Sequence, residues 1–172
     1  MWKIIGFLFV TLVVTEPRAS ASGPASIWRA ATETELKEVI PPRAPVEKER
    51  IETEFRTASA ITDGKGRYIA GVVLITAGYS AEGKYSHFFL TQVPLRVGDL
   101  NLKPGDYVFG WHRNEDSLTV SFYEAQSGKL LGAVQAVRNS RIGKIESFHI
   151  FPPSERPIIQ IGRFGITYKA GG

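Results

Sequence analysis

The sequence contains no cysteine. Disulfide frameworks, thiolate metal sites, cysteine nucleophiles and cysteine-linked lipids are therefore excluded. The chain also lacks a cluster of basic residues, and its formal net charge is only +4. A nucleic-acid backbone needs a cation near each neutralised phosphate, so we expect no nucleic-acid partner. Helical periodicity is absent after residue 50, which favours an all-β domain.

A long apolar run occurs only at the N-terminus. Lys3 precedes the apolar residues 4–14, and the small residues 19–21 follow. This order is typical of a secretory signal peptide, which we predict over residues 1–21. A helix over the apolar run is about 16 Å long, roughly half the hydrocarbon thickness of a bilayer, so we expect no permanent membrane span after cleavage. We expect a secreted or periplasmic protein, and the lack of disulfides favours a bacterial envelope.

The next segment, residues 22–50, is small, polar and rich in proline. Its composition predicts a flexible N-terminal arm. Thr32 and Glu35 have the spacing of a capping box, which predicts a short helix ended by Pro41 and Pro42. We place a single β domain after this arm, over residues 51–170.

Within the β domain, apolar residues recur with a period of two, and turns rich in glycine, asparagine and aspartate separate the segments. Connections this short require mostly antiparallel pairing. Several segments are apolar on both faces, so we expect a second sheet or the arm to cover them. The sequence therefore predicts an antiparallel β-sandwich or flattened barrel of about eight strands with an N-terminal arm. The predicted strands are 51–61, 67–78, 85–95, 106–113, 117–125, 129–137, 145–151 and 157–168.

The segment LKPGDYVFGW, residues 102–111, has a Pro-Gly turn followed by an acidic residue and an aromatic-led strand. It resembles the L-x-P-G-x-Y turn of secreted transthyretin-like and carboxypeptidase-regulatory-like β-sandwich modules. The resemblance covers about ten residues of the chain. It implies a non-catalytic sandwich and transfers no functional residues.

Two patterns suggest enzymatic or cofactor chemistry. Gly78, Gly83 and Lys84 have phosphate-loop spacing, but Tyr85 follows where a magnesium-binding serine or threonine is needed, so we predict a plain hairpin turn. Three histidines on separate predicted strands are weak candidates for a shared zinc or iron site, because metal ligands must converge. These are His87, His112 and His149. We expect no cofactor.

The segment DYVFGWHR places Tyr107, Phe109, Trp111 and Arg113 on one strand face and His112 on the other. The following strand has an apolar face, so we predict that the three aromatic rings lie in the core and that His112 lies with Tyr123 on the wetter side. Exposed, the rings would instead form a stripe that stacks on sugars or contacts a protein.

A further cation, Arg163, shares a predicted strand face with Ile159 and Ile161. This position suits either an anchor for an anionic ligand inside a barrel or a residue at its rim.

Three functions follow, in order of preference. The first is non-catalytic binding of a protein or glycan in the envelope or outside the cell. The second is a β-barrel carrier of a small, partly apolar ligand, which requires an open cavity lined by Phe, Trp and Arg163. The third is a metal-dependent enzyme that uses the strand-borne histidines. The candidate ligand-binding residues are Tyr107, Phe109, Trp111, His112, Tyr123 and Arg163.

Overall fold

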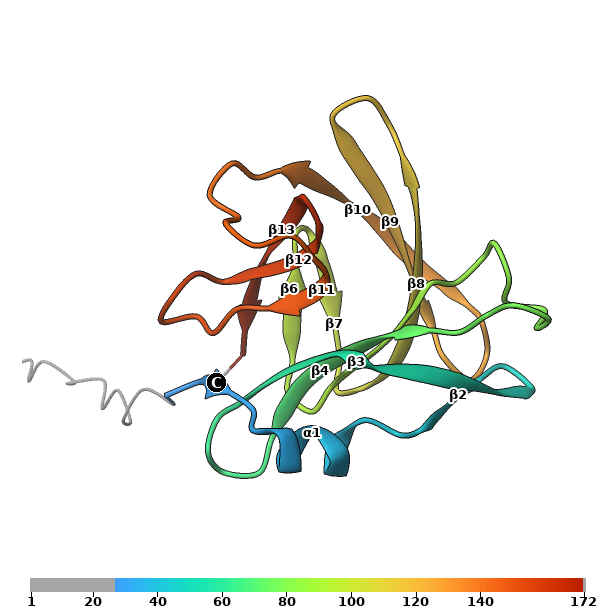
Figure 1. The fold of residues 1–172 in the computed structure, drawn as a ribbon, viewed down its shortest axis with the longest axis horizontal. Coiled ribbons are helices and arrows are strands. Elements are labelled where there is room, and N and C mark those ends of the chain that lie inside the picture. Colours follow the sequence, from blue (N-terminus) through green and yellow to red (C-terminus); the bar gives the residue numbers. More distant parts are fainter. Residues whose placement is uncertain (1–26, 172) are drawn as a thin grey trace, which may run out of the picture.

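The structure of the protein, a computed structural model, describes residues 27–171, so the predicted signal peptide lies outside the described residues. The chain is all-β and antiparallel, which confirms the predicted fold class (Figure 1). The strand number differs from the prediction, because the described residues form thirteen strands and one helix. These elements are β1 (Arg29–Ala30), α1 (Glu33–Val39), β2 (Arg43–Val46), β3 (Glu49–Thr62), β4 (Tyr68–Leu74), β5 (His87–Thr91), β6 (Leu95–Val97), β7 (Leu100–Leu102), β8 (Gly105–Arg113), β9 (Ser117–Glu124), β10 (Leu130–Arg138), β11 (Glu146–Ile150), β12 (Ile158–Gly162) and β13 (Phe164–Ala170).

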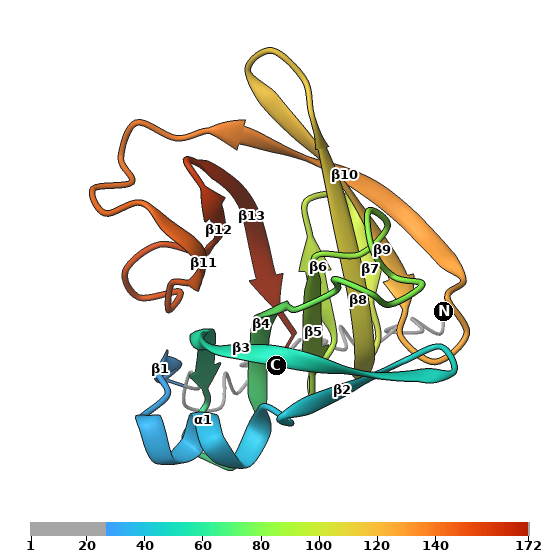
Figure 2. The same cartoon turned by 45° about the vertical axis from the view of Figure 1, so that its right-hand side comes forward.

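The sheet curls into a barrel that is nearly closed (Figure 2). Its main path runs β1-β3-β4-β5-β8-β9-β10-β13-β12-β11. β11 then lies against β3, where the Ile150 amide donates to the Ser59 hydroxyl at 2.9 Å. No backbone ladder joins these two strands in the described part of the chain. A side-chain contact therefore completes the barrel wall in place of ladder hydrogen bonds.

The extra strands lie in the predicted arm (β1 and β2), in residues 95–102 (β6 and β7), and where the alternation of residues 157–168 continued through a turn (β12 and β13). Residues 157–168, predicted as one strand, form the hairpin β12–β13, in which Ile161 pairs with Phe164. Gly162 has a φ of 59°, the positive value that the first central residue of a type II′ turn requires. Residues 95–102 form the hairpin β6–β7, which pairs with β13 and lies against β10.

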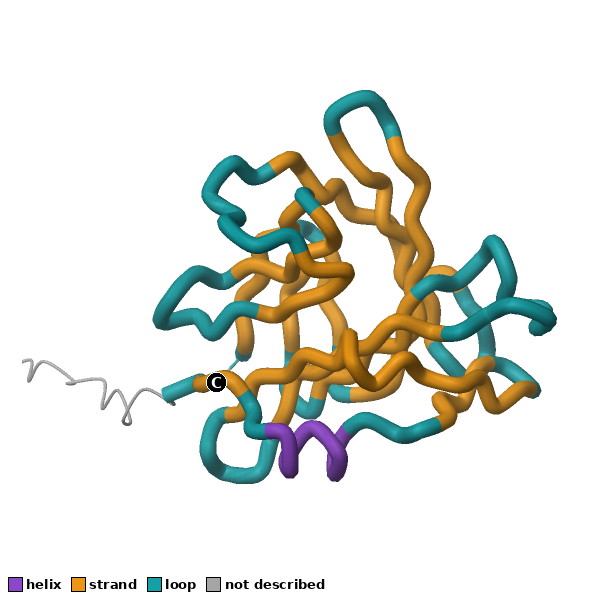
Figure 3. Tube along the Cα trace, in the orientation of Figure 1, coloured by secondary structure: helices purple, strands orange, loops and turns teal. Residues whose placement is uncertain are grey.

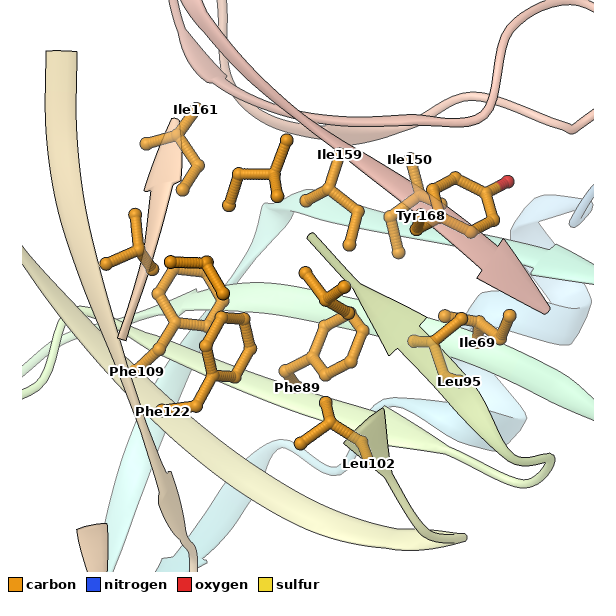
Figure 4. Packing of buried hydrophobic residues seen from close by; sticks show 14 of the residues in the cluster. Ile69, Phe89, Leu95, Leu102, Phe109, Phe122, Ile150, Ile159, Ile161 and Tyr168 are labelled. Carbon is orange, nitrogen blue, oxygen red and sulfur yellow. The ribbon is translucent and has the colours of Figure 1, made fainter. Parts of the chain in front are cut away.

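Buried apolar side chains fill the barrel (Figure 4). Phe89 and Phe122 lie edge to face at its centre, with centroids 6.0 Å apart. Ile150, Ile159 and Tyr168 approach from the C-terminal strands. Large aromatic and branched side chains from facing strands therefore occupy much of the interior, as in small barrels.

A second cluster of buried apolar residues covers the outer face of β3, β4, β5 and β8. The helix α1 lies there, at the bottom of Figure 1, and appears as the single helical segment in Figure 3. Thr32 caps α1 through the predicted capping box. The described part of the predicted arm, residues 27–50, packs on the barrel with Ile40, Ala44 and Val46 buried, so the arm is the cover that the two-sided apolar strands led us to expect as one of two possibilities. This cover explains why strands such as β4 are apolar on both faces.

Among residues 27–171, none of the helical structure is long and apolar enough to cross a membrane.

Candidate functional site

The strand β8 crosses from the core into an open end of the barrel. Tyr107 and Phe109 are buried, whereas Trp111 is 44% exposed. The prediction that all three rings lie in the core was therefore wrong for Trp111. The reason is length, since the β8–β9 hairpin extends beyond the packed interior at the top of Figure 1. Strand alternation keeps Trp111 on the inner face, but no core surrounds that position.

A pocket of about 560 Å³ occupies this end of the barrel. Residues near the ends of several antiparallel strands line it, together with Glu54 and Thr57 from the middle of β3. Eight strands or their immediate flanks contribute. The lining residues are Glu54, Thr57, Val73, Ser86, His87, Trp111, Arg113, Leu118, Ser147, Ile161, Gly162 and Phe164. The pocket is therefore a property of the whole barrel rather than of one loop.

The floor of the pocket includes a buried histidine. His87 is 4% exposed, and its ring stacks on Phe109 with centroids 4.5 Å apart and an interplanar angle of 10°. The ring of Phe148 also packs against His87, at a centroid distance of 5.4 Å and an interplanar angle of 50°. Nδ1 of His87 lies 2.8 Å from the hydroxyl of Ser86. Nε2 makes no hydrogen bond to the described residues and is itself buried.

Burial holds His87 in its neutral form. Removal from water lowers the pKa of His87 to about 3, and the nearby backbone of Ser147 opposes the shift only weakly. At neutral pH the floor therefore carries no charge. A neutral imidazole can accept or donate a hydrogen bond without adding an ionic group to an apolar pocket.

Two lining residues carry formal charges, Glu54 and Arg113. Glu54 accepts hydrogen bonds from the guanidinium of Arg56 at 3.1 and 3.3 Å, and these bonds lower the pKa of Glu54. Arg113 forms no salt bridge with a carboxylate in the described part of the chain. The pocket therefore has one uncompensated charge, which is positive.

A distortion of β3 shapes one wall. The register between β3 and β4 shifts between Glu54 and Ser59, so several residues of β3 have no partner in β4. Thr57 replaces the missing ladder, since its hydroxyl accepts from the Val73 amide at 3.0 Å and donates to the Glu54 carbonyl at 2.8 Å. This bulge turns Thr57 toward the pocket. The alternation of side chains that the sequence predicts over residues 51–61 does not reveal this bulge.

Of the six sequence-predicted ligand residues, only Trp111 lines this pocket. Tyr107 lines a separate pocket of about 390 Å³, and Phe109 is buried in the core beside His87. His112 is exposed on the opposite face of β8, and Tyr123 packs edge to face on Tyr85 at 5.1 Å. Arg163 lies in the β12–β13 turn and lines a separate pocket of about 270 Å³. The sequence prediction thus named Trp111 and its neighbour Phe109 but chose Arg163 as the cation, whereas Arg113 is the arginine in the barrel pocket. Arg113 was identifiable as the residue two places after Trp111 on the same strand face.

The predicted histidine site is not assembled. In residues 27–171, no three His, Asp or Glu side chains are grouped to hold a metal ion. His87 is buried beside Phe109, His112 is exposed, and His149 lies 3.1 Å from Glu146. The phosphate-loop-like segment forms turns, and Lys84 makes an ion pair with Glu47 at 2.8 Å.

Comparisons with known proteins found no matching family model, no significantly similar curated protein and no significantly similar solved structure. The resemblance of residues 102–111 to transthyretin-like modules therefore stays a prediction from the sequence.

Proposed function

We propose that the protein is a carrier or binding protein for a small, mostly apolar ligand, held in the pocket at the open end of the barrel. The observation that carries this proposal is the pocket of about 560 Å³ whose lining comes from eight strands or their immediate flanks. This volume lies in the range of small-molecule sites, roughly 300 to 1,000 Å³. A barrel of this size accommodates one small molecule when side chains do not fill its interior completely.

The chemistry of the lining supports the same proposal. Val73, Leu118, Ile161 and Phe164 provide apolar walls, and Trp111 provides a partly exposed ring. Two exposed lining residues, Ser147 and Arg113, provide polar groups that can orient the ligand. Apolar walls with a small number of placed polar groups are typical of ligand sites.

Binding of a glycan or protein is the second candidate. It is supported by the exposed face of Trp111, which is suited to stacking. A flat stripe of three rings would need Tyr107 and Phe109 at the surface, and both are buried. We favour the carrier for this reason. We further propose that the carrier works outside the cytoplasm, on the basis of the signal-peptide pattern at residues 1–21.

Titration with N-phenyl-1-naphthylamine, a neutral apolar fluorophore, tests the carrier. We expect one saturable site with energy transfer from Trp111. Ser147→Phe places a bulky ring in the pocket and should weaken binding at least about tenfold. Ser154→Phe is the matched control, because Ser154 is exposed and is not among the lining residues, and it should leave binding unchanged. Equal binding by both variants, or no saturable binding by the wild type, would contradict the proposal.

A further inference from the structure

We infer that the ligand is an amphipathic anion whose acidic head group pairs with Arg113 at the rim of the barrel pocket while its apolar part lies against the walls. This inference rests on the proposed carrier function and specifies the ligand class. It follows from the placement of charge in the lining, from the position of Arg113 on β8 and from the neighbouring basic residues.

The charges in the lining favour an anion over a cation. Glu54 is the acidic lining residue, and Arg56 neutralises it through its Nε, its Nη2 and its backbone amide. Arg113 has no carboxylate partner within salt-bridge distance in residues 27–171. A cationic ligand would therefore find the carboxylate of Glu54 already paired with Arg56, and it would be repelled by the guanidinium of Arg113. An anionic ligand would supply the missing partner of Arg113.

The position of Arg113 suits a head group at the rim. Arg113 is the last residue of β8 and lies opposite Leu118, whose side chain is buried. Trp111, two residues earlier on the same strand face, also lines the pocket. The guanidinium therefore lies at the border between apolar wall and water. A planar guanidinium binds carboxylate or phosphate oxygens in a bidentate manner, and its attraction strengthens where water is partly excluded.

Neighbouring residues add positive potential at this end of the barrel. Arg138 and Arg163 line the 270 Å³ pocket, and neither pairs with a carboxylate in the part of the chain that the structure describes. Arg163 stands between Gly162 and Phe164, which both line the barrel pocket, so the two pockets adjoin. Glu115 and Asp116, at the tip of the β8–β9 hairpin, oppose this potential. Unpaired arginines around an opening attract anions to it.

Displacement of bound N-phenyl-1-naphthylamine by decanoate and by decan-1-ol at pH 7.5 tests the inference. The two compounds share an apolar chain and differ in the charge of the head group. We expect decanoate to bind about tenfold more tightly than decan-1-ol. Arg113→Gln should weaken decanoate binding about tenfold, to the level of the alcohol, and should leave the alcohol unchanged. Raising the salt concentration should weaken decanoate binding only in proteins that retain the charge.

Two variants complete the design. Arg50→Gln is the matched control, since it removes an exposed arginine that lines neither pocket, and it should change decanoate binding less than twofold. Arg113→Lys keeps the charge and should retain most of the binding, which separates loss of charge from a folding defect. Equal affinity for decanoate and decan-1-ol, or equal loss in the two glutamine variants, would overturn the inference but leave the carrier function standing. Absence of saturable fluorophore binding would instead overturn the carrier function itself.

Discussion

The imidazole of His87 lies nearly parallel to the ring of Phe109, with centroids 4.5 Å apart. This stack divides the barrel interior into two parts. Phe109 belongs to the packed core, where the centroid of its ring lies 5.1 Å from that of Phe122. His87 lines the open pocket. A residue that sequence reasoning treated as a metal candidate therefore forms the boundary between the stabilising core and the proposed ligand site.

The stability of the protein should fall as the pH drops below about 6.5. His87 has a pKa of about 3 in the folded protein, because burial disfavours its charged form, and an ordinary value of 6.5 when unfolded. The unfolded state therefore binds more protons between these values, and the stabilisation present above pH 6.5 is lost on acidification by about 1.4 kcal/mol per pH unit. Urea denaturation should give a free energy of unfolding about 2 kcal/mol lower at pH 5 than at pH 7.5.

His87→Leu should remove most of this pH dependence, because leucine fills a similar space and does not titrate. Burial also lowers the pKa of His149, which leaves a smaller residual slope of the same sign. Carboxylates such as Glu35, whose pKa is lowered to about 2 mainly by its hydrogen bond from Arg29, affect stability only below about pH 4.5. His112→Leu alters an exposed side chain and should behave like the wild type. If the free energy of unfolding of His87→Leu still fell with decreasing pH as steeply as that of the wild type, His87 would not be the source of the pH dependence.

Gly110→Ala should destabilise the protein by about 2 to 3 kcal/mol. A Cβ at Gly110 would lie 2.0 Å from the carbonyl oxygen of Lys84, and a backbone atom held by turns cannot move aside cheaply. The loop that precedes β5 should be displaced. Gly143→Ala is the control, since a Cβ there meets nothing within 4 Å. Thermal unfolding of both variants measures the difference. Similar melting temperatures would argue against the close approach of Gly110 to the backbone of Lys84.

Asp63→Ala should cost about 2 kcal/mol, because Asp63 organises the β3–β4 turn from a fully buried position. Burial would raise the pKa of this carboxyl, but hydrogen bonds from the Lys65 amide and from Arg67 outweigh that effect and lower the pKa. The bond from Nε of Arg67 is 2.6 Å long. Asp99→Ala removes an exposed partner of Arg96 and should cost less than about 0.5 kcal/mol. Chemical denaturation compares the two variants, and equal losses would contradict the prediction.

Thr32→Ala should destabilise the protein by about 1 kcal/mol. The Thr32 hydroxyl accepts from the Glu35 amide at 3.3 Å, and the Glu35 carboxylate accepts from the Thr32 amide at 2.8 Å. Thr34→Ala, within α1, removes no described hydrogen bond and raises helix propensity, so stability should hold or increase slightly. Urea denaturation of both variants provides the measurement. A larger loss for Thr34→Ala would show that capping does not set the stability of this helix.

Local patterns predicted much of the architecture. The spacing of Thr32 and Glu35 located α1, because capping depends on atoms within one turn of helix. Alternation located most of the long strands, because successive side chains of a strand point to opposite faces wherever that strand is placed. The same rule failed at Gly162, because the residues on both sides of the turn are apolar and the alternation shows no break there.

The sequence by itself determined that this chain forms antiparallel strands with short reversals and that Tyr107, Phe109, Trp111 and Arg113 share one strand face. Only the tertiary structure decided where along β8 the core ends and the pocket begins. The lining of that pocket comes from residues as distant in sequence as Glu54 and Phe164, which meet only when the sheet curls and β11 lies against β3. The alternation of side chains along a strand determines which face a residue lies on. The closure of the barrel determines whether that face is packed against other side chains or borders open space.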